Sequence, residues 1–425
     1  MNLDRAHNRD RSVGKVAYLT SYYPAISHTF IRREVQALRA AGFDVRTYAI
    51  QPIIGRDVLA EVDRDEADRT RYILARGKGS LIFELLRSIM RHPSAFAATA
   101  LAAFRSVNGP RRRLWQCFYA CEAAILQRWM ARDKISHIHA HFANAPADVA
   151  RWTAAIGNRI GGQWTWSFTM HGPTEFYAVG EHGLAAKLID ADFVACISDF
   201  CRSQLMLFSD PSLWNKLHVV HCGVVPEEFP KAIGSTSEVF TIACVGRLVP
   251  EKGQAVLLEA LRLLGRRGVA ARVIFVGAGA SQAWLQDETE RLAVDAEFTG
   301  PVGQDHVIEI LKGVDALCLP SFAEGLPVVL MEAMACGLPV VTTRIAGTQE
   351  LVVDGVNGYV IAPGRADLLA DALAKLALDP TSARAMGTAG AAKVACEFDV
   401  RREAHKLATL FREVKPRQPS QSVQQ

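Results

Sequence analysis

The second half of the chain alternates between short apolar runs and longer amphipathic stretches. Apolar runs of this length, bounded by glycine or proline, are typical of buried parallel strands, and amphipathic stretches between them are typical of crossover helices. This pattern predicts a doubly wound α/β domain with a ligand site at the carboxyl ends of its strands. Strands are expected at 240–246, 271–277, 296–300, 315–320 and 338–343, and helices at 253–267, 281–293, 303–312 and 327–336.

The first half shows the same alternation with a helical interruption. Strands at 16–20 and 45–50 flank a helix for which Ser27 is the expected N-cap, and strands resume after residue 134. Residues 80–132 are expected to form two or three helices without a strand between them. The first half is therefore expected to be a second parallel α/β unit that carries additional helices.

A segment rich in glycine, proline and serine at 223–238 marks the boundary between the two halves. Two Rossmann-like doubly wound domains are therefore expected to face each other across a cleft. The expected units are an N-terminal domain over 1–225 with a helical, basic insertion near 72–132, a C-terminal domain over 226–400, and a C-terminal helix with a disordered tail over 401–425.

Composition and charge narrow the kind of protein. Hydrophobic residues make up 50% of the 425 and charged residues 22%, no apolar run is long enough to span a bilayer, and the polar N-terminus is unlike a signal peptide, so a cytoplasmic protein is expected. The nine cysteines are scattered and odd in number, which favours free thiols, several of them buried. Basic residues exceed acidic ones in residues 1–225 and the reverse holds in 226–425. An anionic partner is expected, either a phosphate-rich substrate or the inner face of the plasma membrane, whereas no nucleic-acid-binding motif is present.

Two carboxylates stand eight residues apart in SFAEGLPVVLMEAMACGLPVVTT, residues 321–343. Glu324 is expected in a loop after a strand, and Gly325 beside it lets a backbone approach a ligand. Pro327 suits the first turn of the helix that carries Glu332. Such a pair can bracket a polyol, and the helix N-terminus suits a diphosphate. The alternative is a first-turn acid followed by a solvated helix residue.

This segment resembles the E-x7-E signature of glycosyltransferase family 4, the group 1 glycosyltransferases with the GT-B fold. Further stretches resemble the same family in the same order, and the resemblance covers about residues 165–400. They are CGVVPEEF (222–229), VGRLVPEKG (245–253), FVGAGASQAWL (275–285) and IAGTQELVVDGVNGYVIAPG (345–364).

The resemblance implies a role for each matching residue. Arg247 and Lys252 would bind the donor diphosphate, Glu332 the ribose, and Glu324 the donor sugar, while His171 in TMHGPTEF would line the sugar site. The implied reaction is retaining and independent of a metal, with a nucleotide-diphosphate sugar as co-substrate and no cofactor. The C-terminal domain would bind the donor and the N-terminal domain the acceptor. Further donor contacts are implied for Gly246, Gly277, Val302, Gly325, Leu326 and Pro327.

The N-terminal segment SYYPAISHTFIRRE stands where this family usually has a glycine pair. It resembles the exopolysaccharide and colanic-acid branch, as does IHAHFA at 138–143. The resemblance implies a lipid-linked acceptor, either a polyprenyl-diphosphate oligosaccharide or a lipopolysaccharide core. Expected acceptor contacts are Tyr22, Ser27, His28 and His141, with Ser27 as a plain helix cap the alternative.

Other patterns leave alternatives open. His137, His139 and His141 share one face of a strand, as a metal triad would, but further ligands are missing, so no metal site is expected. The DxD patterns at 63–65 and 190–192 lie in a polar run and before a strand, respectively, and the glycine turn at 277–279 lacks the third glycine of a dinucleotide site. A phosphorylase, an epimerase or a non-catalytic sugar-nucleotide-binding protein on the same scaffold are the alternative functions. For residues 72–132, docking on an anionic membrane competes with ordinary helix packing under a solvated basic face.

Overall fold

The computed structural model describes residues 14–25, 28–53, 61–75, 77–177, 179–180, 183–235 and 237–414. The expected cap at Ser27 and the expected disordered tail after Lys415 lie outside these residues. Among the described residues, no helix combines the length and the apolar character needed to cross a membrane.

The N-terminal half is built on a parallel sheet of seven strands in the order β3-β2-β1-β4-β5-β6-β7. The strand order reverses between β1 and β4, which is the point where open parallel sheets form ligand crevices. The two-residue β3 at the edge was not predicted. The strands are β1 Lys15–Thr20, β2 Asp44–Ala49, β3 Arg71–Tyr72, β4 His137–His141, β5 Thr165–Met170, β6 Phe193–Cys196 and β7 Leu217–Val219.

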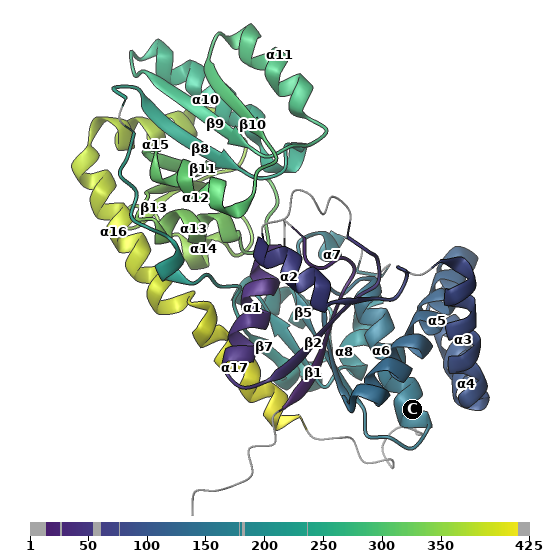
Figure 1. Cartoon of the computed structure of the whole chain (residues 1–425). Helices are drawn as coiled ribbons and strands as arrows, with labels where there is room; N and C mark the ends of the chain where they lie inside the picture. Colours follow the sequence, from purple (N-terminus) through teal and green to yellow (C-terminus); the bar gives the residue numbers. More distant parts are fainter. Residues whose placement is uncertain are drawn as a thin grey trace, which may run out of the picture.

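The C-terminal half holds a second parallel sheet of six strands in the order β10-β9-β8-β11-β12-β13. The fold class expected from the sequence, two parallel α/β sheets with helices, is confirmed (Figure 1). The edge strand β13 was not predicted. The strands are β8 Phe240–Val245, β9 Ala271–Val276, β10 Asp295–Gly300, β11 Ala316–Leu319, β12 Val340–Thr343 and β13 Gly358–Ile361.

Helices cover both sheets. Two or three helices were expected within residues 80–132, and three are present as α3, α4 and α5. Helix α5 packs on α6, and α3 and α4 pack on α5, which adds an outer helical layer to the N-terminal half. The N-terminal helices are α1 Thr29–Ala40, α2 Glu61–Arg69, α3 Lys78–Arg91, α4 Pro93–Arg105, α5 Pro110–Asp133, α6 Ala145–Arg159, α7 Thr174–Tyr177, α8 Leu184–Asp190 and α9 Asp199–Leu207. Those that follow are α10 Gln254–Arg266, α11 Gln282–Leu292, α12 Gln304–Lys312, α13 Val328–Ala335, α14 Thr348–Leu351, α15 Ala366–Leu378, α16 Pro380–Glu397 and α17 Val400–Glu413.

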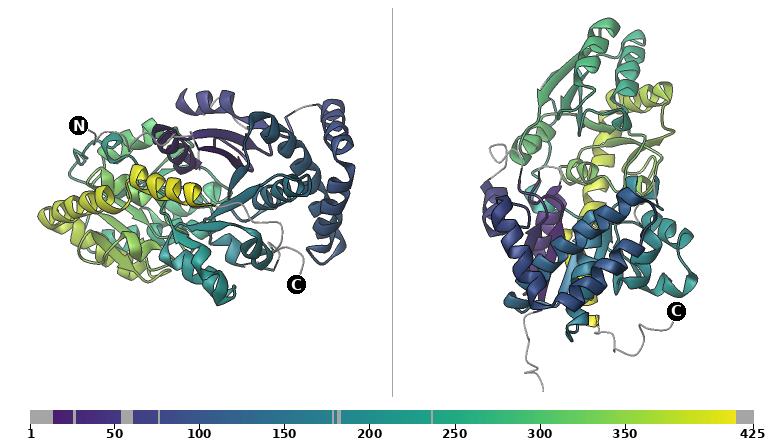
Figure 2. Two further views of the ribbon diagram at one scale, coloured as in Figure 1. Left: turned by 90° about the horizontal axis from the view of Figure 1, so that it is seen from below. Right: turned by 90° about the vertical axis from the view of Figure 1, so that its right-hand side faces the viewer.

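The last helix returns to the first sheet. From α16 the chain runs back along the molecule, and α17 packs beside α1 (Figures 1 and 2). Ala404 and Leu407 of α17 join the same buried cluster as Val16 and Val35. The carboxylate of Asp399 accepts a hydrogen bond from the backbone N–H of Arg401 and caps α17. The C-terminal helix is therefore part of the N-terminal core.

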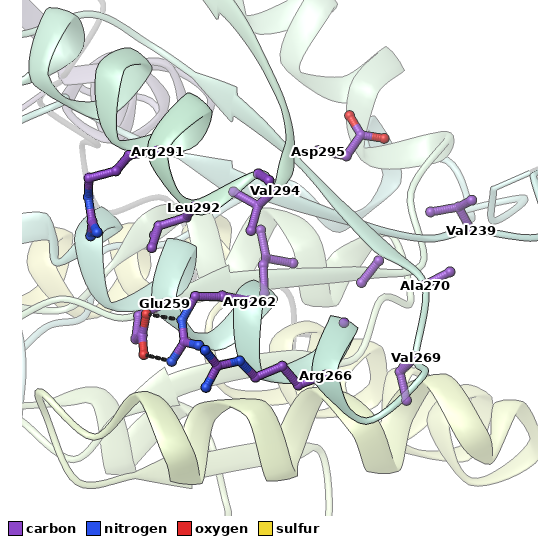
Figure 3. Close-up of a pocket in the computed structure, with 14 residues that line it drawn as sticks. Val239, Glu259, Arg262, Arg266, Val269, Ala270, Arg291, Leu292, Val294 and Asp295 are labelled. Carbon is purple, nitrogen blue, oxygen red and sulfur yellow. Dashed lines mark hydrogen bonds and ion pairs between the residues drawn. The ribbon is translucent and has the colours of Figure 1, made fainter.

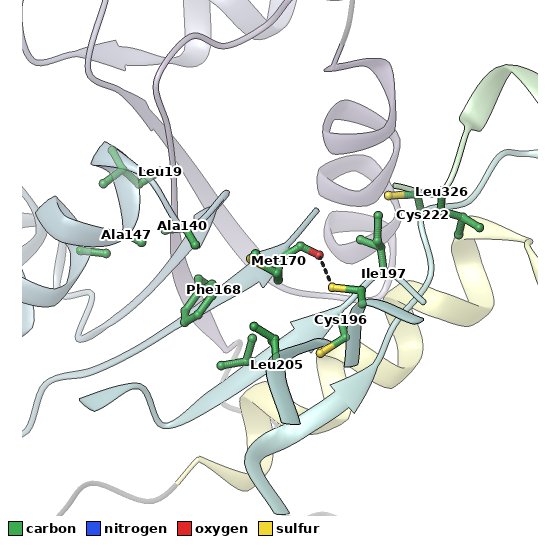
Figure 4. Close-up of a cluster of buried hydrophobic side chains, with 14 of the residues drawn as sticks. Leu19, Ala140, Ala147, Phe168, Met170, Cys196, Ile197, Leu205, Cys222 and Leu326 are labelled. Carbon is green, nitrogen blue, oxygen red and sulfur yellow. Dashed lines mark hydrogen bonds between the residues drawn. The ribbon is translucent and has the colours of Figure 1, made fainter. Parts of the chain in front are cut away.

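The apolar core of the N-terminal half continues into the C-terminal half. Phe168 and Met170 of β5 and Ile197 after β6 belong to one buried cluster, and Leu326 from the loop before α13 belongs to it as well (Figure 4). All nine cysteines are free, and Cys196, Cys244 and Cys318 are buried as expected. Burial raises the pKa of the Cys244 thiol to about 12, so this group is a neutral part of the core.

Candidate functional site

Glu324 lies in the loop after β11, buried and fixed by two donors. The ammonium of Lys252 lies 2.6 Å from its Oε1, and the hydroxyl of Ser321 donates to the same oxygen over 2.7 Å. Lys252 ends a short 3-10 helix, and Gly253 follows it with φ +66°. A Cβ on Gly253 would lie 2.1 Å from the carbonyl oxygen of Pro320. Only glycine permits this approach, which brings Lys252 to the end of β11.

Turns with glycine follow the neighbouring strands. Gly246 follows β8 with φ +151°, and Gly277 follows β9 with φ +134°. A Cβ on Gly277 would lie 2.1 Å from the carbonyl oxygen of Gly246, so these two turns touch through backbone atoms. Arg247 is exposed beside them, and Val302 follows β10. The expected donor contacts of this group therefore share the carboxyl edge of the C-terminal sheet.

Glu332 is buried on α13, and its main partner comes from the other half of the chain. The guanidinium Nη1 of Arg33 on α1 donates to Oε1 of Glu332 over 2.9 Å, and the amide of Gln304 donates to the same oxygen over 3.1 Å. Arg33 is 2% exposed and also lies over the ring of Phe229, 5.3 Å from its centroid. The helix begins at Val328, so Pro327 occupies the N-cap position and not the first turn that was expected. The sequence offered no signal for the Arg33–Glu332 pair beyond the arginines of TFIRRE.

His171 meets the Glu324 loop across the two halves. It follows β5, and a Cβ on Gly325 would lie 2.3 Å from its backbone carbonyl oxygen. Gly325 thus permits backbone contact between the two sheets' carboxyl edges, and Leu326 beside it packs into the N-terminal core. The structure therefore brings His171 together with the segment 321–343.

A chain of polar contacts leads from α1 to His171. The hydroxyl of Tyr18 donates to Glu34 over 2.7 Å, Glu34 Oε1 lies 3.2 Å from His141 Nε2, and His141 Nδ1 lies 3.0 Å from His171 Nε2. Burial, with additional repulsion from His141 and His28, holds the pKa of His171 well below its usual value. His171 is therefore neutral near pH 7. His141, expected as an acceptor contact, is completely buried and contacts His171.

The other two histidines of β4 form a row with hydroxyl groups of β5. His137 contacts Thr165 and Ser167, and His139 contacts Ser167 and Thr169, each over 2.8 Å. Burial lowers the pKa of His137 to about 3 and that of His139 well below its usual value. Ligand atoms of Glu34, His139 and His141 lie within 4.8 Å of one another, but hydroxyl groups already contact both ring nitrogens of His139. Hydrogen bonding accounts for this row.

The expected acceptor contacts lie at the start of α1. Tyr22 is exposed, and the Nδ1 atom of His28 lies 3.4 Å from its carbonyl oxygen. The ring of His28 lies 5.3 Å from that of Phe142, and burial lowers its pKa. His28 takes the N-cap position of α1 without a side-chain cap, and Ser27 is outside the described residues.

Three of the four acids in the two DxD patterns, Asp63, Asp190 and Asp192, have structural partners. Asp63 lies 2.8 Å from Nε of Arg32, and Asp190 lies 2.5 Å from Nε of Arg151. Asp192 accepts the backbone N–H of Trp166. These contacts give the three carboxylates structural roles.

A groove of about 1010 Å³ lies elsewhere (Figure 3). It is lined by Ala271 and Asp295, which begin β9 and β10, and by Glu259, Arg262 and Arg266 of α10. It therefore opens at the amino ends of these strands, opposite the edge that carries Gly277 and Val302. Glu259 and Arg262 pair with each other there (Figure 3).

Known proteins match this chain in sequence. The family described as glycosyl transferases group 1 matches residues 226–393. A D-inositol 3-phosphate glycosyltransferase of Saccharomonospora viridis is 30% identical over 67% of this chain and 67% of its own length. The amylovoran biosynthesis glycosyltransferase AmsK of Erwinia amylovora is 27% identical over 93% of this chain and 99% of its own length. The putative colanic acid biosynthesis glycosyltransferase WcaL of Salmonella typhimurium is 28% identical over 94% and 100%.

Solved structures match the fold. Sucrose-phosphate synthase of Thermosynechococcus elongatus superposes with a TM-score of 0.72 at 19% identity, over 94% of this chain and 98% of that one. HepE of Anabaena in complex with UDP-glucose gives 0.69 at 17% identity, over 93% and 98%. The two sheets thus form the GT-B fold that the resemblance implied. The chain belongs to the group 1 glycosyltransferases, and the predicted likeness to their exopolysaccharide branch is confirmed.

Proposed function

We propose that this glycosyltransferase moves a hexose from a nucleotide-diphosphate sugar to a glycan acceptor, with retention of the anomeric configuration. One observation carries the proposal. The ion pair of Glu324 and Lys252 lies at the carboxyl edge of the C-terminal sheet, and Gly325 touches His171 at the carboxyl edge of the other sheet. A sugar held there would be reached from both halves of the protein.

The charges suit the departure of a nucleoside diphosphate. As the glycosidic bond breaks, negative charge develops on the diphosphate, and fixed cations stabilise it. The guanidinium of Arg247 can grip two phosphate oxygens, whereas the ammonium of Lys252 acts as a point charge. Glu324 holds Lys252 in place through their 2.6 Å contact. In this proposal the two cations replace a metal ion, so activity is expected to persist in EDTA; loss in EDTA with recovery in Mn²⁺ would contradict it.

Glu332 is proposed to hold the donor ribose. A carboxylate can accept hydrogen bonds from two neighbouring hydroxyls, and Arg33 and Gln304 fix this one through Oε1. HepE, which has the same fold, binds UDP-glucose, and this supports a nucleotide sugar as the donor. A change of Glu332 to Gln keeps the shape but weakens the contact, so donor affinity should fall by about 1–3 kcal/mol. Unaltered affinity in calorimetry would refute the assignment.

Retention rests on the family resemblance. In the mechanism proposed for this family, the acceptor attacks the anomeric carbon from the same face from which the leaving group departs. The stereochemistry can be read directly. Proton NMR of the first-formed product should show the anomeric configuration of the donor, and the opposite configuration would overturn this part of the proposal.

The acceptor is proposed from the relatives that match end to end. AmsK and WcaL are named for amylovoran and colanic acid biosynthesis, which supports a role in exopolysaccharide assembly here. A polyprenyl-diphosphate-linked oligosaccharide is the proposed acceptor and a lipopolysaccharide core the alternative. The proposed acceptor would enter beside Tyr22 and His28, on the cytoplasmic side of the membrane.

A thermal-shift series with UDP- and GDP-linked hexoses tests the core of the proposal. The matching donor should raise the melting temperature, because a ligand that binds only the folded state stabilises it. The same donor should give no shift with a variant in which Lys252 and Arg247 are both changed to Ala. Release of sugar 1-phosphate from a glycan on addition of inorganic phosphate, with cleavage of its terminal glycosidic bond, would instead support the phosphorylase alternative.

A further inference from the structure

The outer helical layer leaves one side of α3 without a protein neighbour among the described residues. The layer lies beyond α6, at the end of the N-terminal half that is remote from the C-terminal sheet (Figures 1 and 2). Leu81 and Leu85 of α3 pack toward the core, and Ser88 is buried. The opposite side of the same helix therefore faces outward.

That outward side is apolar. Ile82, Phe83, Leu86 and Met90 are 57%, 64%, 54% and 77% exposed. Their spacing of one, three and four residues places them in a single stripe along the helix. Single exposed hydrophobic residues are common on proteins, but a continuous stripe of four large ones marks a site of contact. We call these four residues the α3 stripe.

The neighbouring helices add aromatic side chains to the layer. Trp115 and Phe118 near the start of α5 are about half exposed, with their rings 5.7 Å apart. The guanidinium of Arg113 lies 5.1 Å from the ring centroid of Phe104 on α4, so the ends of α4 and α5 are in contact. Aromatic rings beside basic groups are favoured where an apolar region meets charged lipid headgroups.

The charges around the α3 stripe have one sign. Arg87 and Arg91 are exposed and directly follow Leu86 and Met90 in the chain. Residues 78–121 contain seven basic residues and one acid. That acid, Glu84, accepts hydrogen bonds from Arg128 and from the indole of Trp129 on α5, so it turns toward the protein. The outward side thus combines an apolar stripe with positive charge.

We propose that the α3 stripe and its arginines dock the protein on an anionic lipid bilayer. The stripe occupies one side of α3 along its length, so the helix can lie in the plane of the membrane interface with this side in the bilayer. The arginines complement anionic headgroups. An apolar protein groove would match the stripe but gives no reason for the excess of arginines. Docking does not depend on which donor is used. It would hold the acceptor side of the protein near lipid-linked substrates.

Vesicle co-sedimentation tests the proposal with the full chain. Binding is expected to vesicles of phosphatidylcholine with phosphatidylglycerol, to be weak on phosphatidylcholine alone, and to fall in high salt. Two double variants separate the apolar from the charged contribution: Phe83→Ser with Met90→Ser, and Arg87→Glu with Arg91→Glu. Loss of two basic contacts should lower partitioning roughly 25-fold or more, because each basic residue near an anionic surface contributes about fivefold.

A matched control uses exposed residues on the other half. Leu378 is 74% exposed at the end of α15, and Arg384 is exposed on α16, so Leu378→Ser with Arg384→Glu changes the same kinds of side chain away from the α3 stripe. This control should bind vesicles like the parent protein. Binding that survives both α3 double variants would overturn the proposal. So would a concentration-dependent dimer that both α3 variants abolish in light scattering, since the stripe would then join two copies of the chain.

Discussion

The ion pair between Arg33 and Glu332 joins the two halves of the chain and should be expensive to break. Both side chains are nearly inaccessible, at 1% and 7%, and Nη1 lies 2.9 Å from Oε1. Removal of one partner leaves the other charge buried without its counter-ion, which costs about 3–5 kcal/mol. In an Arg33→Ala variant only the 3.1 Å contact with Gln304 remains of the two donors to this oxygen. The free energy of unfolding should therefore fall by about 3–5 kcal/mol.

Urea unfolding followed by circular dichroism measures this loss, and a double-mutant cycle assigns it to the pair. Arg33→Met combined with Glu332→Met removes both charges together, so the double variant should be less unstable than the sum of the single ones by at least about 1 kcal/mol. The exposed pair of Arg46 and Asp44, 2.9 Å apart, provides the control, and Arg46→Ala should cost less than about 1 kcal/mol. Additivity of the two single changes within about 0.5 kcal/mol would show that the buried contact contributes nothing specific, and the reasoning would be wrong.

Three further outcomes are expected. Lys252→Met should lower kcat by about 100- to 1000-fold in a steady-state transfer assay, because a fixed cation at the developing charge is lost, whereas Lys252→Arg should retain more activity; equal kcat in both would contradict the assignment. Gly325→Ala places a Cβ 2.3 Å from the His171 carbonyl oxygen and should cost about 1–3 kcal/mol in urea unfolding, whereas Gly265→Ala, at an open position within α10, should be neutral or stabilising. Burial holds the pKa of His137 at about 3 and those of His139 and His171 well below their usual value, so the unfolded chain binds more protons below about pH 6.5. Stability should then fall as the pH drops from about 6.5 toward 3, by about 1.4 kcal/mol per pH unit for each such histidine, and a flat profile would contradict this.

The positions of the expected donor residues at one edge of the sheet could be predicted from the sequence because their determinants are local. Gly246 and Gly277 each follow a strand whose apolar run is evident, and parallel strands end at one edge of a sheet, so their turns had to be neighbours. Glu324 and Lys252 are 72 residues apart in the chain, yet both lie in loops that follow such strands. The sequence therefore placed both at one edge of the sheet, whereas the contact between them was not predicted.

Contacts between the two halves could not be predicted in the same way. Arg33 and Glu332 are 299 residues apart, and neither the periodicity of α1 nor that of α13 shows which partner a buried charge will meet. The sequence of α17 also does not indicate that this helix packs on the first sheet, because its apolar face could pack on either half. The α3 stripe posed the opposite difficulty: from the sequence its four apolar residues could equally have been core.

Two consecutive residues of α1 connect the halves of the proposed site. Arg33 reaches Glu332, the proposed ribose ligand, and Glu34 reaches His171 through His141. A shift of α1 would therefore displace the carboxylate of Glu332 and the side chain of His171 together. The helix starts within the SYYPAISHTFIRRE segment that replaces the glycine pair common in the family, and His28 and Tyr22 lie at or before its N-terminal end. An acceptor bound at this end would contact the same helix that fixes Glu332. If the proposed sites are right, acceptor binding would alter donor binding through α1, because a rigid element that packs against both sites can carry coupling between them.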